Sequence, residues 1–185
     1  VVNALSEWVE VENCRDGKKY TERFETGKVA RPFKCEGETD RHGLYVRFKP
    51  DNTIFDEVVF EYDTLLKRLR EQAFLNAGIH IIFADERGET PVVTDLQYDG
   101  GVRSFVEYLN KHKEPLFKPP VYIEGVKNNT TVEVALQWND SYNENVISFA
   151  NNIHTVDGGT HEAGFKNTIT AILNKFALRH NMLKE

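Results

Sequence analysis

Residues 158–165, with the sequence GGTHEAGF, have side chains and a backbone that could bind a phosphate or a metal ion. Two glycines, a hydroxyl and an imidazole stand at the start of a long amphipathic run. A P-loop requires a lysine at the position that Phe165 occupies. A zinc site needs three or four Cys or His ligands, and only His154 lies near His161. The residues therefore favour a tight glycine turn, with Thr160 as the hydroxyl cap of a helix.

The composition indicates a globular chain, because 40% of its 185 residues are hydrophobic and 28% are charged. The net charge of −6 excludes a surface that is basic throughout, so a nucleic-acid contact would need a local basic cluster. No charged-then-apolar leader opens the sequence, and no apolar run reaches the roughly 18 residues that span a bilayer. We therefore expect a cytoplasmic protein without membrane contact. Cys14 and Cys35 are expected to be free thiols, with a disulfide in an oxidising compartment as the alternative.

Hydrophobic periodicity predicts an α/β chain that has two halves. Each half is expected to be a two-layer (α+β) arrangement of strands and a helix. Asp16 and Gly17 form a two-residue turn between strand-like runs within residues 8–28, which is a strong hairpin signal. Further strands are expected at residues 43–50, 79–85, 92–98, 130–140 and 144–155. Helices are expected at residues 62–78, at 102–112 and from Thr160 onward. The proline-rich segment 114–125 is expected to be extended. The pattern restarts at Gly100 and Gly101, so each half is expected to have its own sheet. The opening VVNALSEW has helix-like spacing without a cap, which favours a helix that begins upstream.

A longer motif in the second half of the chain resembles that of a known protein family. The run QWNDSYNENVISFANNIHTVDGGTHEAGF is similar to the second-domain signature of the B subunits of bacterial DNA gyrase. The segments VVNALSEW, RFKPD, RLREQAFLNAG, YDGGVRSFVEYLN and VEVALQWND follow in that family's order, so the resemblance covers the whole chain. The E subunit of topoisomerase IV is the close competitor. The resemblance implies that residues 1–99 are the C-terminal part of a Bergerat-type ATPase domain. It also implies that residues 100–185 begin a transducer domain with a left-handed βαβ crossover, an exception to the usual handedness.

The resemblance also implies an activity. Family members are ATPase subunits of type IIA DNA topoisomerases, which use ATP and Mg²⁺, act on DNA, homodimerise through an ATP-bound gate and work with a gyrase A-like cleavage subunit. The family's catalytic Glu, magnesium-binding Asn, adenine-binding Asp and ATP lid are expected upstream of Val1, and its γ-phosphate lysine beyond Glu185. We therefore expect no catalytic residue or metal ligand in this chain, which alone should be inactive. The alternative is a non-catalytic paralogue that binds a partner or DNA.

Three residues stand at positions of the family's nucleotide pocket. Arg15 matches an arginine at the pocket mouth, where a guanidinium can stack or form forked hydrogen bonds. Val46 matches an apolar wall residue near the adenine. Leu44 departs from the pattern, because the family usually has a threonine whose hydroxyl helps to hold the adenine. The alternative for Leu44 and Val46 is that both are core residues of a half-buried strand.

One basic residue of the last helix matches a DNA contact of the family. Lys166 corresponds to a residue that lines the cavity through which the transported DNA segment passes, and it falls off the apolar stripe that includes Phe165 and Phe176. Lys175 and Arg179 are expected to add to this DNA cavity. The alternative is an ordinary solvated helix surface.

Overall fold

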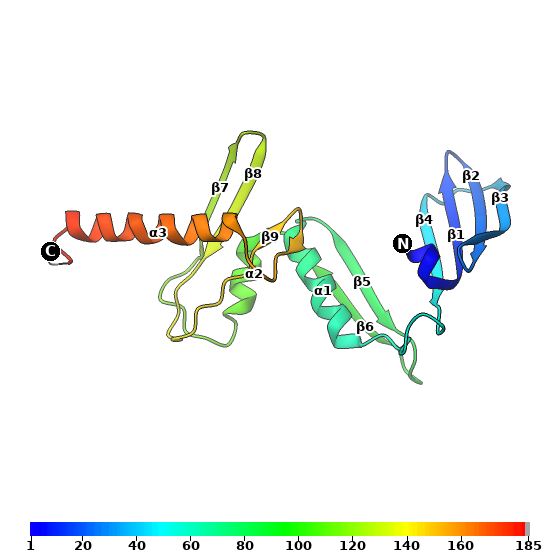
Figure 1. Cartoon of the computed structure of the whole chain (residues 1–185), viewed down its shortest axis with the longest axis horizontal. Helices are drawn as coiled ribbons and strands as arrows, with labels where there is room; N and C mark the ends of the chain where they lie inside the picture. Colours follow the sequence, from blue (N-terminus) through cyan, green and yellow to red (C-terminus); the bar gives the residue numbers. More distant parts are fainter. Residues whose placement is uncertain (184–185) are drawn as a thin grey trace. The chain divides into compact units, whose positions relative to one another are not determined.

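Figure 1 shows the fold of the protein as a computed structural model, which describes residues 1–183. The chain divides into two compact units, Val1–Glu61 and Tyr62–Glu185. Each unit builds its own antiparallel strand pairs, and the described part of the second also contains three α-helices. No helix among the described residues is long and apolar enough to cross a membrane.

The first unit is a four-stranded antiparallel sheet with the strand order β3-β2-β1-β4. Its elements are η1 Val2–Leu5, β1 Ser6–Arg15, β2 Lys18–Glu25, β3 Lys28–Glu38 and β4 Gly43–Pro50. Asp16 and Gly17 have φ angles of 53° and 73°, as the two central residues of a type I′ turn require. The predicted hairpin is therefore confirmed. The helix-like spacing at the start of the chain produces only the short 3-10 helix η1, because Val9 already belongs to β1.

Strand β3 is the element that sequence periodicity missed. Its eleven residues are all exposed, so no alternation of buried and exposed positions marks it. It contains Pro32, which cannot donate a backbone hydrogen bond, but β3 is an edge strand and one of its sides has no partner strand in the described sheet. The pairing with β2 also shifts register, and one shift lies between Thr21 and Arg23, which pair with Lys34 and Arg31.

The second unit begins with a helix packed on a two-stranded sheet. Helix α1 spans Tyr62–Leu75, and β5 His80–Asp85 pairs with β6 Val92–Gln97. These three elements match the predicted segments, and Gly78, at a φ of 86°, follows the end of α1 as a helix terminator. Phe74 and Leu96 are each 1% exposed and form the centre of the core.

Aromatic rings connect this core to the next helix, α2 Gly101–Leu109. The ring of Phe74 stacks on Tyr98 at 3.7 Å and on Phe105 of α2 at 5.0 Å between centroids. Tyr108 adds a tilted contact with Phe74 at 5.4 Å. Residues on both sides of the 99/100 boundary therefore share one aromatic cluster. The division into residues 1–99 and 100–185 comes from the family resemblance, and it stays a prediction.

The rest of the second unit contains two hairpins and the longest helix. Strands β7 Val121–Lys127 and β8 Thr130–Leu136 form a hairpin around Asn128 and Asn129, which have positive φ angles. The strand predicted at residues 144–155 is wrong. The chain instead forms β9 Phe149–Ala150 and β10 Ile153–His154, joined by a left-handed turn, and it is irregular before them. All strand pairs among the described residues are antiparallel, so the left-handed βαβ crossover stays a prediction.

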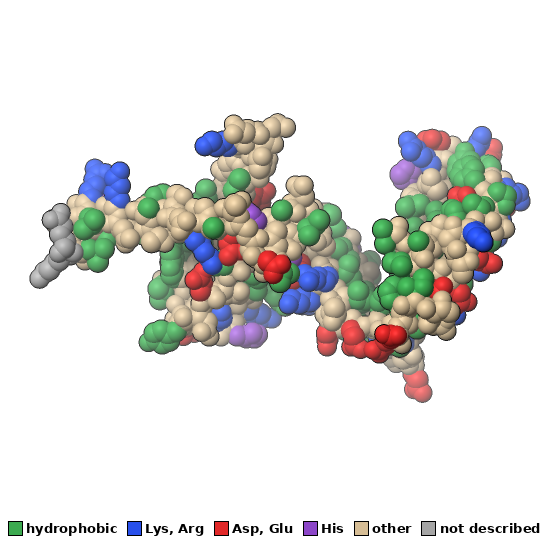
Figure 2. All heavy atoms as spheres, viewed as in Figure 1, with side chains coloured by type: hydrophobic (Ala, Val, Ile, Leu, Met, Phe, Trp, Pro, Cys, Tyr) green, Lys and Arg blue, Asp and Glu red, His purple; other side chains and the backbone are tan. Residues whose placement is uncertain are grey.

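Helix α3, Thr160–Arg179, confirms the predicted last helix, but its apolar stripe is not buried. Ile172, Leu173 and Phe176 are between 46% and 61% exposed. Figure 2 shows hydrophobic side chains on the open surface of this helix. Helical periodicity therefore located the helix, although the second half of its apolar face stays about half exposed in the described structure.

Candidate functional site

The three predicted nucleotide-pocket residues lie on one face of the sheet in the first unit. In the register of β1 and β4, Leu44 lies opposite Asn13, and Val46 lies opposite Val11. Directly paired residues of antiparallel strands project to the same face, and residues two apart in one strand do so as well. Arg15 follows Asn13 by two positions in β1. The strand register therefore brings Arg15, Leu44 and Val46 to a common surface.

This surface is open within the described chain. Leu44 is 68% exposed and Val46 is 46% exposed, so neither is a core residue of the first unit. The Nε atom of Arg15 is 3.6 Å from Oδ2 of Asp16, which is too long for a hydrogen bond, and the Arg15 side chain is 72% exposed. The guanidinium and the two aliphatic side chains are therefore available to a ligand or to another part of a longer protein.

An apolar hollow of about 230 Å³ extends the same face beyond Val46. Phe48, two positions after Val46 in β4, lines it together with Val58 and Phe60. The rings of Phe48 and Phe60 meet edge to face at 6.2 Å between centroids. No sequence pattern marks this hollow, because Val58 and Phe60 lie in the irregular segment between β4 and α1.

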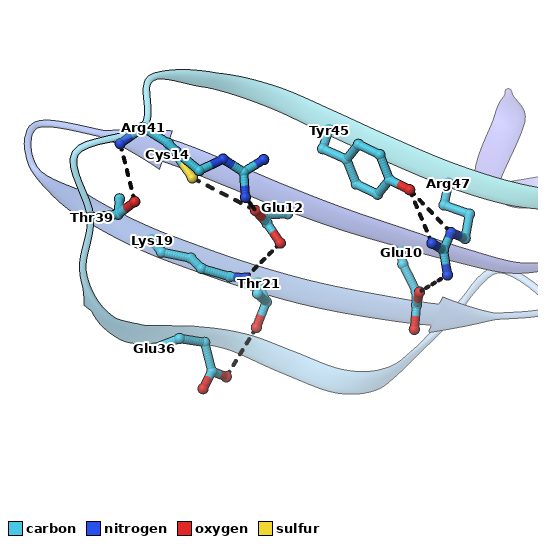
Figure 3. Close-up of polar contacts among 10 residues, drawn as sticks. All are labelled: Glu10, Glu12, Cys14, Lys19, Thr21, Glu36, Thr39, Arg41, Tyr45 and Arg47. Atoms are coloured by element: carbon cyan, nitrogen blue, oxygen red, sulfur yellow. Dashed lines mark hydrogen bonds and ion pairs between the residues drawn. The ribbon is translucent and has the colours of Figure 1, made fainter. Parts of the chain in front are cut away.

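The opposite face of the sheet carries a ladder of ion pairs, shown in Figure 3. Glu12 accepts a hydrogen bond from Nζ of Lys19 at 2.6 Å and another from Nη1 of Arg41 at 2.9 Å. The Lys19 bond, with smaller contributions from the Lys19 and Arg41 charges, lowers the pKa of Glu12. Glu10 likewise accepts a bond from Arg23 at 2.6 Å, which raises the pKa of the Arg23 guanidinium. This charged face leaves the face of Leu44 and Val46 as the more apolar side of the sheet.

The segment GGTHEAGF forms a turn and a helix start, but Thr160 is not its cap. Gly159 is the N-cap, no side chain caps the helix there, and Thr160 is already the first helical residue. The predicted hydroxyl cap is therefore wrong. Gly158 has a φ of 73°, which explains the first glycine. A Cβ atom on Gly159 would lie 2.8 Å from the His161 ring, so another residue there would require this exposed ring to move.

Glu162 is the polar side chain that anchors this helix start, although it does not cap a backbone N–H. Its carboxylate lies in the first turn of α3, where a negative charge interacts favourably with the helix dipole. Oε2 accepts a hydrogen bond from the Ser148 hydroxyl at 2.7 Å, and Oε1 lies 3.1 Å from Nζ of Lys166. The Ser148 bond, followed by that of Lys166, lowers the pKa of Glu162. The glutamate thus fixes the chain before α3 to the helix.

Among the described residues, His161 makes one polar contact, with Nε2 at 3.4 Å from the Thr155 hydroxyl. The contact joins the first turn of α3 to the turn that precedes it. In the part of the chain that the structure describes, no group of three or more His, Cys, Asp or Glu side chains could hold a metal ion. Cys14 and Cys35 are free thiols, as predicted.

Lys166 is held by two carboxylates. Its Nζ atom lies 2.9 Å from Oε1 of Glu144 and 3.1 Å from Oε1 of Glu162. The Glu144 bond, and then the Glu162 bond, raise the pKa of Lys166, so the side chain is a stable cation. Lys166 is 43% exposed and can still be reached by an anion.

Lys175 and Arg179 lie on the exposed second half of α3. Lys175 follows Lys166 by nine positions, and at about 100° per residue the two side chains project from nearly opposite sides of the helix. Lys175 and Arg179 are four apart and share a side. The three basic residues therefore do not form one continuous face, and their contact with DNA stays a prediction.

Comparisons with known proteins connect this geometry to one family. Residues 101–185 match the family described as DNA gyrase B. The B subunit of DNA gyrase from Clostridium acetobutylicum is 52% identical over 100% of this chain and 29% of its own length. The B subunit of DNA topoisomerase 4 from Enterococcus faecalis is 49% identical over 100% of this chain and 27% of its own length.

A solved structure agrees in fold over nearly the whole chain. It is the 43K ATPase domain of Thermus thermophilus gyrase B in complex with an aminocoumarin, with a TM-score of 0.82 and 37% sequence identity. The match covers 99% of this chain and 50% of that one. The chain spans less than a third of the two curated relatives named above. These comparisons give no support to the alternative of a non-catalytic paralogue.

Proposed function

The chain belongs to the DNA gyrase B family, and from this membership we propose that it forms part of the ATPase subunit of a type IIA DNA topoisomerase. In the whole protein, ATP binding and hydrolysis would be coupled to the passage of one DNA segment through another and to supercoiling. The observation that carries this proposal is the 37% identity and TM-score of 0.82 to a gyrase B ATPase domain over 99% of the chain.

The surface of Arg15, Leu44 and Val46 fits one side of a nucleotide. Aliphatic side chains on a strand offer a flat apolar wall against which a purine base can pack. The exposed guanidinium of Arg15 can contact a polar group at the mouth of such a pocket. Leu44 has no hydroxyl, so at this position adenine would gain apolar contact but no hydrogen bond.

The described residues do not fit the phosphate end of the ligand. Because no acidic or histidine cluster among them could hold a cation, the Mg²⁺ that neutralises the phosphates would need ligands from other residues of the full-length protein. Residues 1–99 would supply one wall of the ATP pocket. Residues 100–185 would form the start of the transducer domain.

The DNA contact would lie on the second unit. Lys166 is the first candidate for a contact with the transported segment, and Lys175 with Arg179 would meet a phosphate backbone on another side of α3. The partners in this proposal are DNA, a gyrase A-like cleavage subunit and a second copy of the full-length chain. Cytoplasmic location follows from the same proposal.

A DNA topology assay tests the proposed function. The full-length protein is mixed with its cleavage subunit and relaxed plasmid, with ATP and Mg²⁺ or without ATP. We expect negative supercoils, or decatenation of linked circles, only when ATP is present. A non-hydrolysable ATP analogue is the control for turnover. If plasmid topology and linkage stay unchanged with ATP, although the cleavage subunit still cuts DNA, the proposed function is wrong.

A further inference from the structure

Lys166 lies between two carboxylates that are held very differently. Glu162 is on α3 itself, four residues before Lys166, and its side chain is only 19% exposed. Its second oxygen is bound by Ser148, whose hydroxyl also lies 2.7 Å from that of Thr155. Glu162 is thus fixed by the fold and holds the ammonium group in place.

Glu144, unlike Glu162, is not fixed by the surrounding fold. It lies in the irregular segment between β8 and β9, and its side chain is 69% exposed. The 2.9 Å contact with Nζ of Lys166 is the one interaction that the described structure gives its carboxylate. Exposed ion pairs between long side chains contribute little to stability, because solvent screens the charges and both side chains lose conformational freedom. The Glu144 carboxylate can therefore leave Lys166 without disturbing the fold.

The charges around Lys166 do not favour a phosphate while Glu144 is bound. One ammonium group faces two carboxylates, so the cluster carries a net negative charge. A carboxylate and a phosphate compete for the same N–H donors. If the carboxylate of Glu144 moves into solvent, the remaining pair of Lys166 and Glu162 is neutral and has free donors that face outward.

We propose that Glu144 occupies the position on Lys166 that a DNA phosphate takes in the working enzyme, and that it sets the DNA concentration at which the enzyme responds. This inference rests on the proposed DNA contact of Lys166. Glu144 acts as a competitor within the protein, which a single phosphate displaces without any wider rearrangement. Glu162 stays bound to Ser148 and keeps Lys166 directed at the exchange position.

The test uses the full-length protein with its cleavage subunit and measures the ATPase rate as linear duplex DNA of mixed sequence is added. In Glu144→Gln the competing charge is lost, so the half-saturating DNA concentration should fall by about 2- to 5-fold at low salt. The maximal rate at saturating DNA should stay the same, because only the competition has changed. Glu89→Gln is the matched control. Glu89 is exposed in the turn between β5 and β6, and its substitution removes the same charge without touching Lys166.

A double-mutant cycle shows whether the effect passes through Lys166. Lys166→Gln should raise the half-saturating DNA concentration, and adding Glu144→Gln to it should change nothing further. If Glu144→Gln leaves the half-saturating DNA concentration unchanged, the proposal that Glu144 competes with DNA is wrong. The same holds if Glu144→Gln lowers that concentration equally when Lys166 is replaced. If Lys166→Gln leaves the DNA response unchanged, then the DNA contact of Lys166 in the proposed function is what fails.

Discussion

Asn152 donates a hydrogen bond from Nδ2 to Oδ1 of Asn76 at 2.7 Å, across 76 positions of the sequence. Gln72, one turn earlier in α1, donates to the backbone carbonyl of Asn152 at 3.0 Å. These two bonds attach the turn between β9 and β10 to the end of α1. The β9–β10 hairpin, which precedes α3 in the chain, is thereby attached to α1 within the second unit.

Asn152 also has a positive φ of 64°, so its substitution separates two effects. Asn152→Gly keeps the backbone conformation and loses the side-chain bond, which should cost about 0.5–1.5 kcal/mol. Asn152→Ala should cost about 1–2 kcal/mol more than Asn152→Gly, because a Cβ atom is strained at this φ and glycine has none. Amide hydrogen exchange in α1 and in the β9–β10 turn measures the loss locally. Asn151→Gly is the control, because Asn151 has a φ of 48° and no side-chain hydrogen bond among the described contacts. Equal losses in the Ala and Gly variants would contradict the role of the backbone conformation.

Leu44→Thr should strengthen ATP binding by the full-length protein. If Leu44 faces the adenine, a hydroxyl there adds one buried hydrogen bond, and the KM for ATP should fall by about 2- to 10-fold. Steady-state ATPase kinetics measure this change. Val29→Thr serves as the control, because Val29 is also a half-exposed strand residue but belongs to the edge strand β3. An unchanged KM in Leu44→Thr would mean that Leu44 does not face the base.

Asp85 should titrate at an unusually low pH. Nε and Nη2 of Arg87 donate to its two carboxylate oxygens at 2.9 and 2.6 Å, which lowers the pKa of Asp85 to about 2. A lowered pKa stabilises the fold above the ordinary carboxyl pKa of 3.8, and this contribution disappears as the pH falls toward 2. An NMR titration of the Asp85 carboxyl should show this midpoint. Arg87→Gln should shift it up toward 3.8, whereas Arg103→Gln should not; a midpoint that stays low in Arg87→Gln would contradict the ion-pair explanation.

The 185-residue chain alone should not bind ATP tightly. Its pocket surface offers one guanidinium and an apolar wall, and its described residues include no His, Cys, Asp or Glu cluster that could hold the metal ion for the phosphates. Immobilising a nucleotide costs at least about 4 kcal/mol before any contact contributes. Calorimetric titration with a non-hydrolysable ATP analogue and Mg²⁺ should show no saturable binding in the micromolar range. A micromolar dissociation constant would mean that the pocket has been misplaced.

The two cysteines should differ in reactivity. Cys14 is 3% exposed, whereas Cys35 lies on the exposed edge strand β3. Access controls the reaction of a thiol with a maleimide, so Cys35 should be labelled rapidly and Cys14 only after unfolding. Mass spectrometry of peptides from native and urea-treated protein counts each label. Cys35→Ser, which should leave the native protein unlabelled, is the control. Rapid native labelling of Cys14 would contradict its burial.

Local residue patterns determined most of the secondary structure. Asp16 and Gly17 specify a type I′ turn from their backbone preferences alone, and the periodicity of residues 62–78 specifies α1. Strands β4, β5 and β6 can likewise be predicted from the local sequence, because their branched and aromatic residues lie between turn residues. The long motif around GGTHEAGF identified the family, and the comparisons bear this out. In each of these cases the signal lies within neighbouring residues.

The tertiary structure determines those features that depend on contacts between residues far apart in the sequence. Strand β3 is exposed on both faces and exists because β2 pairs with it, so no pattern of its own marks it. The local sequence predicts a hydroxyl cap at Thr160, but the start of α3 is anchored by the hydrogen bond from Ser148 to Glu162, which joins residues 14 apart.

The partners of Lys166 show the same limit. A lysine beside an apolar stripe predicts an available charge, yet the fold brings Glu144 from a separate segment onto its ammonium group. The local sequence specifies which conformations a segment prefers. Which charges meet depends on how the whole chain folds back on itself, because electrostatic contacts are set by distance in space rather than by position in the sequence.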